Sequence, residues 1–282
     1  MRTSVLMGAA MLSLFSFTTQ AQTLKTPAPS PTQTLKQNFG VGDITIDYSR
    51  PSVKGRVVFG ELVPFGKIWR TGANGATKIT FSDDVKLEGN DVKAGTYALY
   101  SIPNKDAWEI MLYKDLALGG NVADYKVENE VLRFTVKPTA YLEKIESFTI
   151  NLTDITPTSA NLELIWDKTR VSVKITTEID AKVMKNIEAV VTTDTRPYFQ
   201  AANYYYENGK DLNQALVWAN KATEQNPKAF FMMLLKARIE LKLNDKKSAI
   251  ASAEKTIVLS KEAKNEDFVK MAEGVLAEAK KK

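Results

Sequence analysis

The spacing of hydrophobic residues changes once along this chain, and that change limits the possible folds more than any other feature. From Val41 to Thr177 apolar residues alternate with polar ones, whereas after Glu178 they recur with a helical period. Alternation is typical of strands with one face in a core and one face in water. We therefore expect a β-rich domain over residues 37–177 and an α-helical domain over residues 178–282.

Within the β-rich part, several segments show the strand pattern clearly. The strictly alternating segments are Ile44–Tyr48, Leu132–Val136, Phe148–Leu152 and Val171–Ile175. Thr96–Ile102 and Trp108–Tyr113 are apolar on both faces, so we expect them to be central or covered. A turn signal at residues 167–169 predicts a hairpin between segments 162–166 and 171–175. Strands at this spacing, without helices between them, favour an antiparallel β-sandwich or jelly-roll-like domain.

The helical part contains a weak repeat with a period of 34 residues, in which Ala215 and Ala219 recur as Ala249 and Ala253. The first unit resembles a tetratricopeptide repeat. The positions that carry this resemblance are Tyr206, Ala215, Ala222 and Pro227. Since two repeats are fewer than stable arrays usually need, we expect this part to pack against the sandwich or against a protein partner. A final helix, Glu266–Lys280, is predicted to cover the open end.

The tyrosine run 204–206 in the helical part has two interpretations. It fits a peptide-binding groove, because helical repeats bind peptides on a concave face. It fits packing between helices as well, and the shortness of the array favours this second interpretation.

The first residues predict export from the cytoplasm. Arg2 precedes an apolar run from Val5 to Phe17, and small residues at Thr19 and Ala21 follow. This order is typical of a secretory signal peptide. We therefore predict a signal peptide over residues 1–21, cleaved near Ala21, and a periplasmic or secreted protein. Residues 22–36, rich in Pro, Thr and Ser, are predicted to be a flexible lead-in. No later apolar run is long enough to cross a bilayer.

Composition excludes several classes of chemistry. The chain has no His and no Cys, so it lacks the residues of a Ser-His-Asp triad, a thiol redox site or a histidine-containing zinc site. The formal net charge of +5 becomes +4 without Arg2, which is ordinary for an exported protein and does not indicate nucleic-acid binding. We predict neither a cofactor nor a metal. Calcium at Asp83 and Asp84 is a weaker alternative to a simple turn.

The segment from Tyr48 to Thr77 combines cations, aromatic residues, glycines and prolines in one long loop. Such loops are more often functional than decorative. The candidate ligand-binding residues are Arg50, Lys54, Arg56, Trp69, Arg70 and Asn74. Guanidinium groups bind carboxylate or phosphate through paired hydrogen bonds, and a Trp ring offers a flat face to a sugar. The pattern favours a glycan or an anionic small molecule as ligand, bound over about residues 49–77.

A purely structural explanation of the same segment stays open. Trp69 and Phe65 would then close the end of the sandwich. Arg50 or Arg70 would pair with a buried carboxylate such as Asp47 to fix the segment in place.

With these residues in view, the chain resembles a secreted bacterial family called domain of unknown function 2911. The resemblance rests on the tract SRPSVKGRVVFGELVPFGKIWRTGANGAT, on the following AGTYALYSIP strand and on a strand that begins with Trp108. It extends over about residues 37–177. The resemblance implies export and a β-rich fold, and a helical tail accompanies the domain in many members. It implies no activity or catalytic residue.

These observations favour an exported binding or interaction protein of the cell envelope over an enzyme. The alternative is a glycan-acting hydrolase, in which one carboxyl group protonates the leaving oxygen and a second attacks or activates water. Its candidate carboxylates are Asp47, Asp91, Asp106 and Glu109. A nucleophile formed by Ser49 or Ser52 with Lys54 is a further enzymatic alternative, which requires a desolvated lysine.

Overall fold

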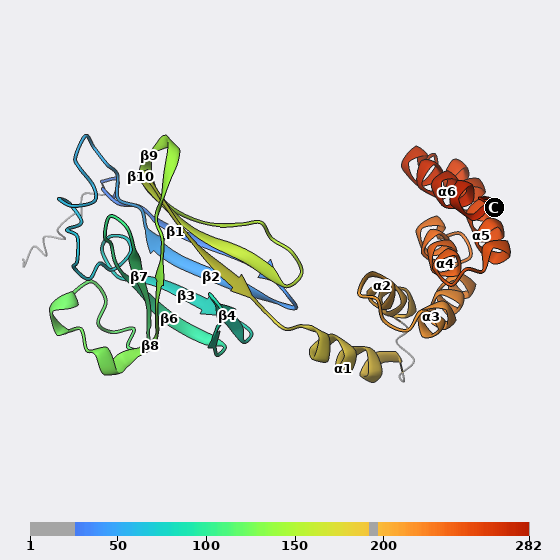
Figure 1. Cartoon of the computed structure of the whole chain (residues 1–282), viewed down its shortest axis with the longest axis horizontal. Helices are drawn as coiled ribbons and strands as arrows, with labels where there is room; N and C mark the ends of the chain where they lie inside the picture. Colours follow the sequence, from blue (N-terminus) through green and yellow to red (C-terminus); the bar gives the residue numbers. More distant parts are fainter. Residues whose placement is uncertain (1–25, 192–196, 282) are drawn as a thin grey trace, which may run out of the picture. The chain divides into compact units, whose positions relative to one another are not determined.

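The computed structural model describes residues 26–191 and 197–281 of the 282-residue chain. It divides at Thr176 into a β unit and a helical unit (Figure 1). The predicted signal peptide and residues 22–25 of the predicted lead-in lie outside the described residues.

The β unit consists of two antiparallel sheets. The first sheet has the strand order β1-β2-β3-β6-β7-β8 and the second β5-β4-β10-β9. The strands of the first sheet are β1 (Thr32–Phe39), β2 (Gly42–Ser49), β3 (Thr77–Phe81), β6 (Gly95–Ile102), β7 (Trp108–Tyr113) and β8 (Glu130–Val136). Those of the second are β4 (Val85–Leu87), β5 (Asn90–Val92), β9 (Thr139–Thr153) and β10 (Ser159–Thr176). The predicted sandwich-like β domain is confirmed.

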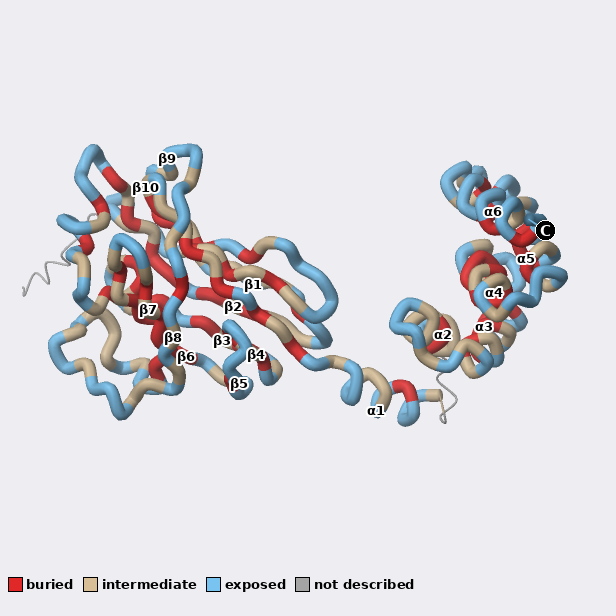
Figure 2. The backbone as a smooth tube through the Cα atoms, viewed as in Figure 1, coloured by how far each residue is buried: buried red, intermediate tan, exposed pale blue. Residues whose placement is uncertain are grey.

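One hydrophobic core lies between the two sheets. It joins residues of the first sheet, such as Ile46 and Leu99, to residues of the second, such as Phe148 and Val173. Figure 2 shows these inward-facing positions as buried along most strands. The alternation in the sequence arises because only one face of each outer strand meets this core.

The neighbouring strands β6 and β7 bury their other face as well. Tyr100 of β6 and Met111 and Tyr113 of β7 form a second apolar cluster with Tyr125. The segment between β7 and β8 covers this face and carries two short 3-10 helices, Val122–Asp124 and Val127–Asn129. The prediction that these two strands are central or covered is confirmed, because the segment between β7 and β8 covers them.

Two predictions are wrong in the β unit. Residues 32–36 are not a flexible lead-in, because β1 pairs with β2 from Thr32 to Phe39 and its Leu35 packs against the core. The predicted hairpin over residues 162–175 is one continuous strand, β10. Asp167 adopts a φ of 53°, and the register with β9 shifts on both sides of it, so the turn signal marks a bulge.

The helical unit contains α1 (Asp180–Val191), α2 (Tyr198–Glu207), α3 (Leu212–Gln225), α4 (Phe230–Lys242), α5 (Lys246–Glu262) and α6 (Glu266–Ala279). Ala215 and Ala219 of α3, and Ala249 and Ala253 of α5, are all buried. Small side chains at these repeated positions let paired helices approach closely. Helix α6 adds Ala272 and Val275 to a cluster with α4 and α5, which agrees with the predicted end cap. The tail has the predicted repeat-like architecture.

Candidate functional site

The segment between β2 and β3, residues 50–76, lies at one end of the β unit and is hydrogen-bonded to both sheets; we call it the bridging segment. Near its start, Val53 donates a backbone hydrogen bond to Glu146 of β9 (2.8 Å), and Phe148 donates one to Pro51 (2.8 Å). Near its end, Trp69 and Ser101 of β6 exchange two backbone hydrogen bonds of 2.7 and 2.9 Å. The glycines and prolines therefore shape a loop that both sheets hold in place.

The Trp69 ring closes this end of the sandwich. Its indole N–H donates to the Gly72 carbonyl (3.0 Å), and its ring stacks on Trp166 of β10 at 5.9 Å between centroids. Phe59 packs edge-on against both rings, and Trp108 packs edge-on against Trp69. Because Trp69 is only 9% exposed, its ring belongs to the core and offers no open face for stacking a sugar.

A cavity of about 340 Å³ opens beside this aromatic cluster, between the bridging segment and the sheets. Its lining residues are Ser30, Pro51, Arg56, Leu62, Val63, Pro64, Lys67, Ile68, Trp69, Arg70, Gly72, Ala73 and Trp166. This volume falls at the lower end of the range for small-molecule sites, roughly 300–1,000 Å³. Three of the predicted residues, Arg56, Trp69 and Arg70, therefore lie in one concavity.

The cavity lining carries positive charge only: among its described residues, three are cations and none is a carboxylate. Arg56 donates from Nε to the Val53 carbonyl (3.0 Å) and from Nη2 to the Ser52 carbonyl (2.6 Å), which holds its side chain in place. Lys67 is exposed.

Arg70 is the least satisfied of the three cations. Its Nη1 donates one long hydrogen bond, 3.4 Å, to the Gly120 carbonyl. Within the described part of the chain, its Nε is buried and has no hydrogen-bond partner. A buried donor without a partner costs about 1–3 kcal/mol.

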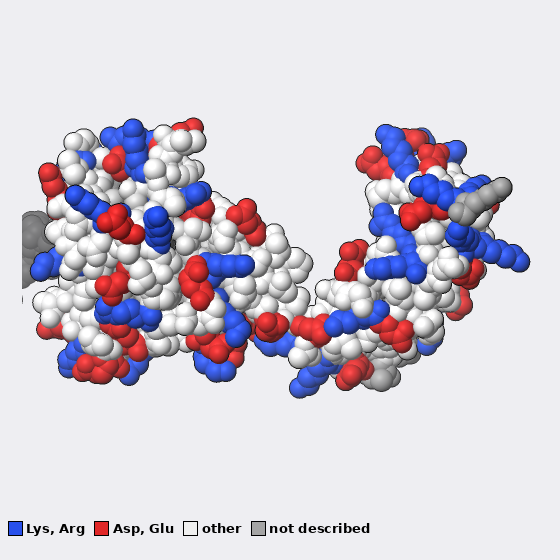
Figure 3. Space-filling model, viewed as in Figure 1, with Lys and Arg blue, Asp and Glu red and all other residues white. Residues whose placement is uncertain are grey.

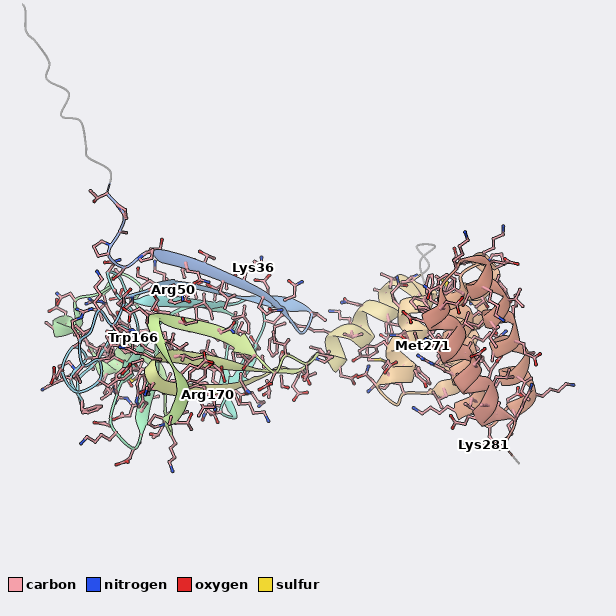
Figure 4. All side chains as sticks on the ribbon, turned by 90° about the horizontal axis from the view of Figure 1, so that it is seen from above. Lys36, Arg50, Trp166, Arg170, Met271 and Lys281 are labelled. Carbon is pink, nitrogen blue, oxygen red and sulfur yellow. The ribbon has the colours of Figure 1, made fainter. Side chains whose placement is uncertain are left out.

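Arg50, another of the predicted ligand-binding residues, has a structural role. The Arg50 guanidinium donates to the Phe148 carbonyl (3.0 Å), Gln33 Oε1 (2.9 Å) and Thr149 Oγ1 (2.8 Å), and so ties the end of β2 to β1 and β9. Figure 4 places Arg50 and Trp166 at the same end of the β unit. Arg50 therefore holds the segment in place, as the structural explanation suggested, but through a carbonyl, an amide and a hydroxyl in place of the carboxylate of Asp47.

Asn74 and Lys54 likewise lie outside the cavity lining. Asn74 takes a φ of 61° and donates to the Ser30 carbonyl (3.2 Å) and to Ser49 Oγ (3.1 Å). Lys54, at a φ of 48°, is exposed, and its backbone N–H donates to Glu146 (2.7 Å). Both residues shape the loop.

The carboxylates suggested for a hydrolase are dispersed. Glu109 pairs with Arg133 on the outer face of the first sheet, and the hydrogen bond and charge of Lys86 lower the pKa of Asp91, the reverse of what a general acid needs. Asp47 accepts a hydrogen bond from Thr34, and Asp106 is exposed. Figure 3 shows acidic and basic side chains interspersed over the drawn face.

The weaker alternatives gain no support either. Asp84 pairs with Lys93 at 2.8 Å. Among the described residues, no group of three or more acidic side chains is placed to hold a metal ion. Ser52 Oγ lies 3.4 Å from Ser147 Oγ, and Ser49 Oγ accepts from Asn74, so each serine has a partner other than Lys54.

In the helical unit, the three consecutive tyrosines contact other parts of the same unit. Tyr204 donates to Asp180 of α1 (2.8 Å), Tyr205 packs edge-on against Trp218, and the ring of Tyr206 lies 4.9 Å from Lys242 Nζ. These contacts agree with packing between helices as the main task of the run.

The sequence alone does not identify the whole cavity wall. Lys67 lies in the same tract as the predicted residues but is not among them. Leu62 and Ile68 look like ordinary loop residues. Trp166 lies in a strand far along the chain; its alternation indicates that it faces inward, but not which end of the sandwich it reaches.

The comparisons with known proteins give one match. The sequence model of a family described as "Protein of unknown function (DUF2911)" matches residues 30–175, more than half of the chain. No match was found among curated proteins or among solved structures. Among the described residues, no helix has both the length and the apolar character needed to cross a membrane.

Proposed function

Since the chain belongs to the DUF2911 family, whose function is unknown, we propose from the site itself that the β unit binds a small anionic ligand. The ligand occupies the cavity beside Trp69 and is held by Arg56, Lys67 and Arg70. The observation that carries the proposal is the charge of the cavity: among its described lining residues, three are cations and none is a carboxylate.

The donor pattern favours an anion over a neutral sugar. Guanidinium and ammonium groups donate hydrogen bonds and accept none, so they match carboxylate, phosphate or sulfate oxygens. Sugar hydroxyl groups need acceptors as well as donors. In addition, the burial of Trp69 and Trp166 leaves no open ring face for a sugar.

Tryptophan fluorescence of the full-length mature protein provides a direct test, because Trp69 and Trp166 line the cavity. We expect a saturable change with phosphate, sulfate or malonate and none with glucose. Lys67→Ala should weaken anion binding about tenfold, the value of one charged contact of roughly 1.4 kcal/mol. Binding should weaken further as salt rises.

A matched control is Lys174→Ala, which removes an equally charged, exposed side chain from the far part of β10. It should leave the affinity for anions unchanged. Equal binding of glucose and phosphate, or an equal loss in both lysine variants, would disprove the proposal.

The cellular setting that we propose is the envelope, outside the cytoplasm, and it rests on the order of charge, apolar run and small residues in the first 21 residues. Mass spectrometry of protein recovered from the periplasm or medium should give an N-terminus at Gln22 or within a few residues of it. A cytoplasmic chain that still begins at Met1 would contradict export.

A further inference from the structure

A simple inorganic anion would contact only the charged part of the cavity lining. Besides the three cations, the lining includes the apolar residues Leu62, Val63, Pro64 and Ile68. Water in contact with these side chains would be released by an apolar group of a ligand. The cavity therefore has the character of a site for a molecule with two ends, one charged and one apolar.

The rim of the cavity carries exposed apolar side chains as well, next to the exposed Glu61. Residues 57–64, which we call the tip, form a tight turn in which Leu62 donates a backbone hydrogen bond to Val57 (3.2 Å) and Val63 donates one to Val58 (2.8 Å). Val58 and Val63 are buried and anchor the tip. Val57 and Leu62 are 55% and 39% exposed.

The backbone bond between Val57 and Leu62 places these two exposed residues side by side across the turn. Leu62 lines the cavity, and Arg56, which also lines it, directly precedes Val57. Positive charge and exposed apolar surface thus meet at the cavity mouth.

We propose that the ligand is an amphiphilic anion, a phosphate or carboxylate carried on an apolar chain. This inference rests on the proposed anion site and specifies its ligand. The anionic head lies against Arg56, Lys67 and Arg70, and the first methylenes of the chain lie against Leu62, Val63 and Ile68. Such a molecule is either a lipid in a bilayer or a free amphiphile, and the experiment below separates these two sources.

The head and the chain can be varied independently in four titrations of the full-length mature protein. The probes are inorganic phosphate, octyl phosphate, octyl glucoside and glucose, with both octyl compounds kept below the concentration at which they form micelles. Each methylene that leaves water tightens binding about fourfold. With two or three methylenes buried, octyl phosphate should bind at least about tenfold more tightly than phosphate, while octyl glucoside binds weakly.

The tip supplies the variant. Replacing Val57 and Leu62 together by Ser should reduce the ratio of octyl phosphate affinity to phosphate affinity about threefold or more. Val41→Ser with Ile155→Ser is the matched control, because these residues have similar exposures of 49% and 42% and lie in turns after β1 and β9, away from the cavity. The control should leave the ratio unchanged, and melting temperatures should confirm that both variants fold.

Co-sedimentation with vesicles of phosphatidylglycerol and phosphatidylcholine, against phosphatidylcholine alone, identifies the source. Binding to the anionic vesicles that falls in the double variant Val57→Ser with Leu62→Ser supports a bilayer lipid. Tight octyl phosphate binding without vesicle binding supports a free amphiphile.

Two results would overturn the inference in distinguishable ways. If phosphate and octyl phosphate bind equally well, the anion site stands but the amphiphilic ligand does not. If neither binds, the proposed anion site fails as well.

Discussion

Arg50 and Arg70 lie in the same segment and carry the same group, but their surroundings give them different tasks. Arg50 donates three short hydrogen bonds to residues of β1 and β9. Arg70 makes a single long one and keeps a buried Nε without a partner in the described chain. Hydrogen bonds from a charged group contribute about 1.5–3 kcal/mol each, so the first arginine is a structural clamp. The second has donors left for a ligand.

Arg50→Ala should therefore lower the free energy of unfolding by about 2–4 kcal/mol. It removes three charged hydrogen bonds between strands, and the loss stays below their full sum because Arg50 is half-buried and water screens its charge. Urea denaturation followed by tryptophan fluorescence measures this loss. Lys54→Ala, an exposed cation in the same segment, should stay within about 0.5 kcal/mol of the parent protein. Equal losses in the two variants would show that Arg50 is not a clamp.

Glu240 predicts a pH dependence of the helical unit. The residue is 3% exposed, its Oε2 has no partner among the described residues, and Lys236 Nζ is 3.8 Å from Oε1. Burial raises the pKa of Glu240. A raised carboxyl pKa adds stability below the unfolded pKa of about 4.3, and that stability is lost as pH rises through the higher folded pKa.

Thermal melts followed by circular dichroism at 222 nm, between pH 4 and pH 8, should show this loss of helical stability. Glu240→Gln should weaken the fall of melting temperature with rising pH, and it should stabilise the unit by about 1 kcal/mol at pH 8. If the melting temperature of Glu240→Gln falls with pH as steeply as that of the parent protein, a group other than Glu240 causes the pH dependence.

At the scale of elements, β10 shows what the sequence predicts and where it stops. Its inward residues have even numbers up to Trp166 and odd numbers from Val171, so the alternation changes parity within one strand. A hairpin and a bulge both produce such a change, and the turn signal at Asp167 fits either. Only the pairing of β10 with β9 and β4 distinguishes a bulge from a hairpin, and the local hydrophobic pattern does not predict which strands pair.

The candidate site, too, could be predicted from the sequence only in part. Alternation and period identified the strands and helices, because those patterns follow from which face is buried. The bridging segment could be selected from its own residues. Arg56 and Arg70 share a cavity, whereas Arg50 does not. This difference depends on contacts to β9 and β10, nearly a hundred residues later in the sequence.

The bulge in β10 gives an element-scale prediction. Asp167 has a φ of 53°, a conformation that β-branched residues rarely adopt and Gly adopts freely. Asp167→Val should cost about 1–2 kcal/mol, whereas Asp167→Gly should be close to neutral. Chemical denaturation of both variants checks the sign. Equal stability of the Val and Gly variants would contradict the bulge.

At the scale of the whole molecule, the described cavity belongs entirely to one unit, since its lining lies between Ser30 and Trp166. The helical unit instead has two small clusters, one over α1–α4 and one over α4–α6. Short helical arrays depend on contacts between neighbouring repeats, so small clusters limit cooperativity.

Separate expression of residues 26–176 and 177–282 tests this division. The β fragment should fold and bind phosphate within about twofold of the full chain, and the helical fragment should melt broadly. A sharp, two-state melt of the isolated helical fragment would contradict the second expectation, and loss of phosphate binding by a folded β fragment would contradict the first.

Arg70→Ala, studied by phosphate titration and urea denaturation on the same preparation, tests the central claim most directly. Because Arg70 has no carboxylate partner in the described chain and only one 3.4 Å hydrogen bond, its removal should change the free energy of unfolding by less than about 1 kcal/mol. Phosphate binding should nevertheless be lost. Retained binding, together with a loss of several kcal/mol of stability, would show that Arg70 is part of the scaffold and that the cavity is not an anion site.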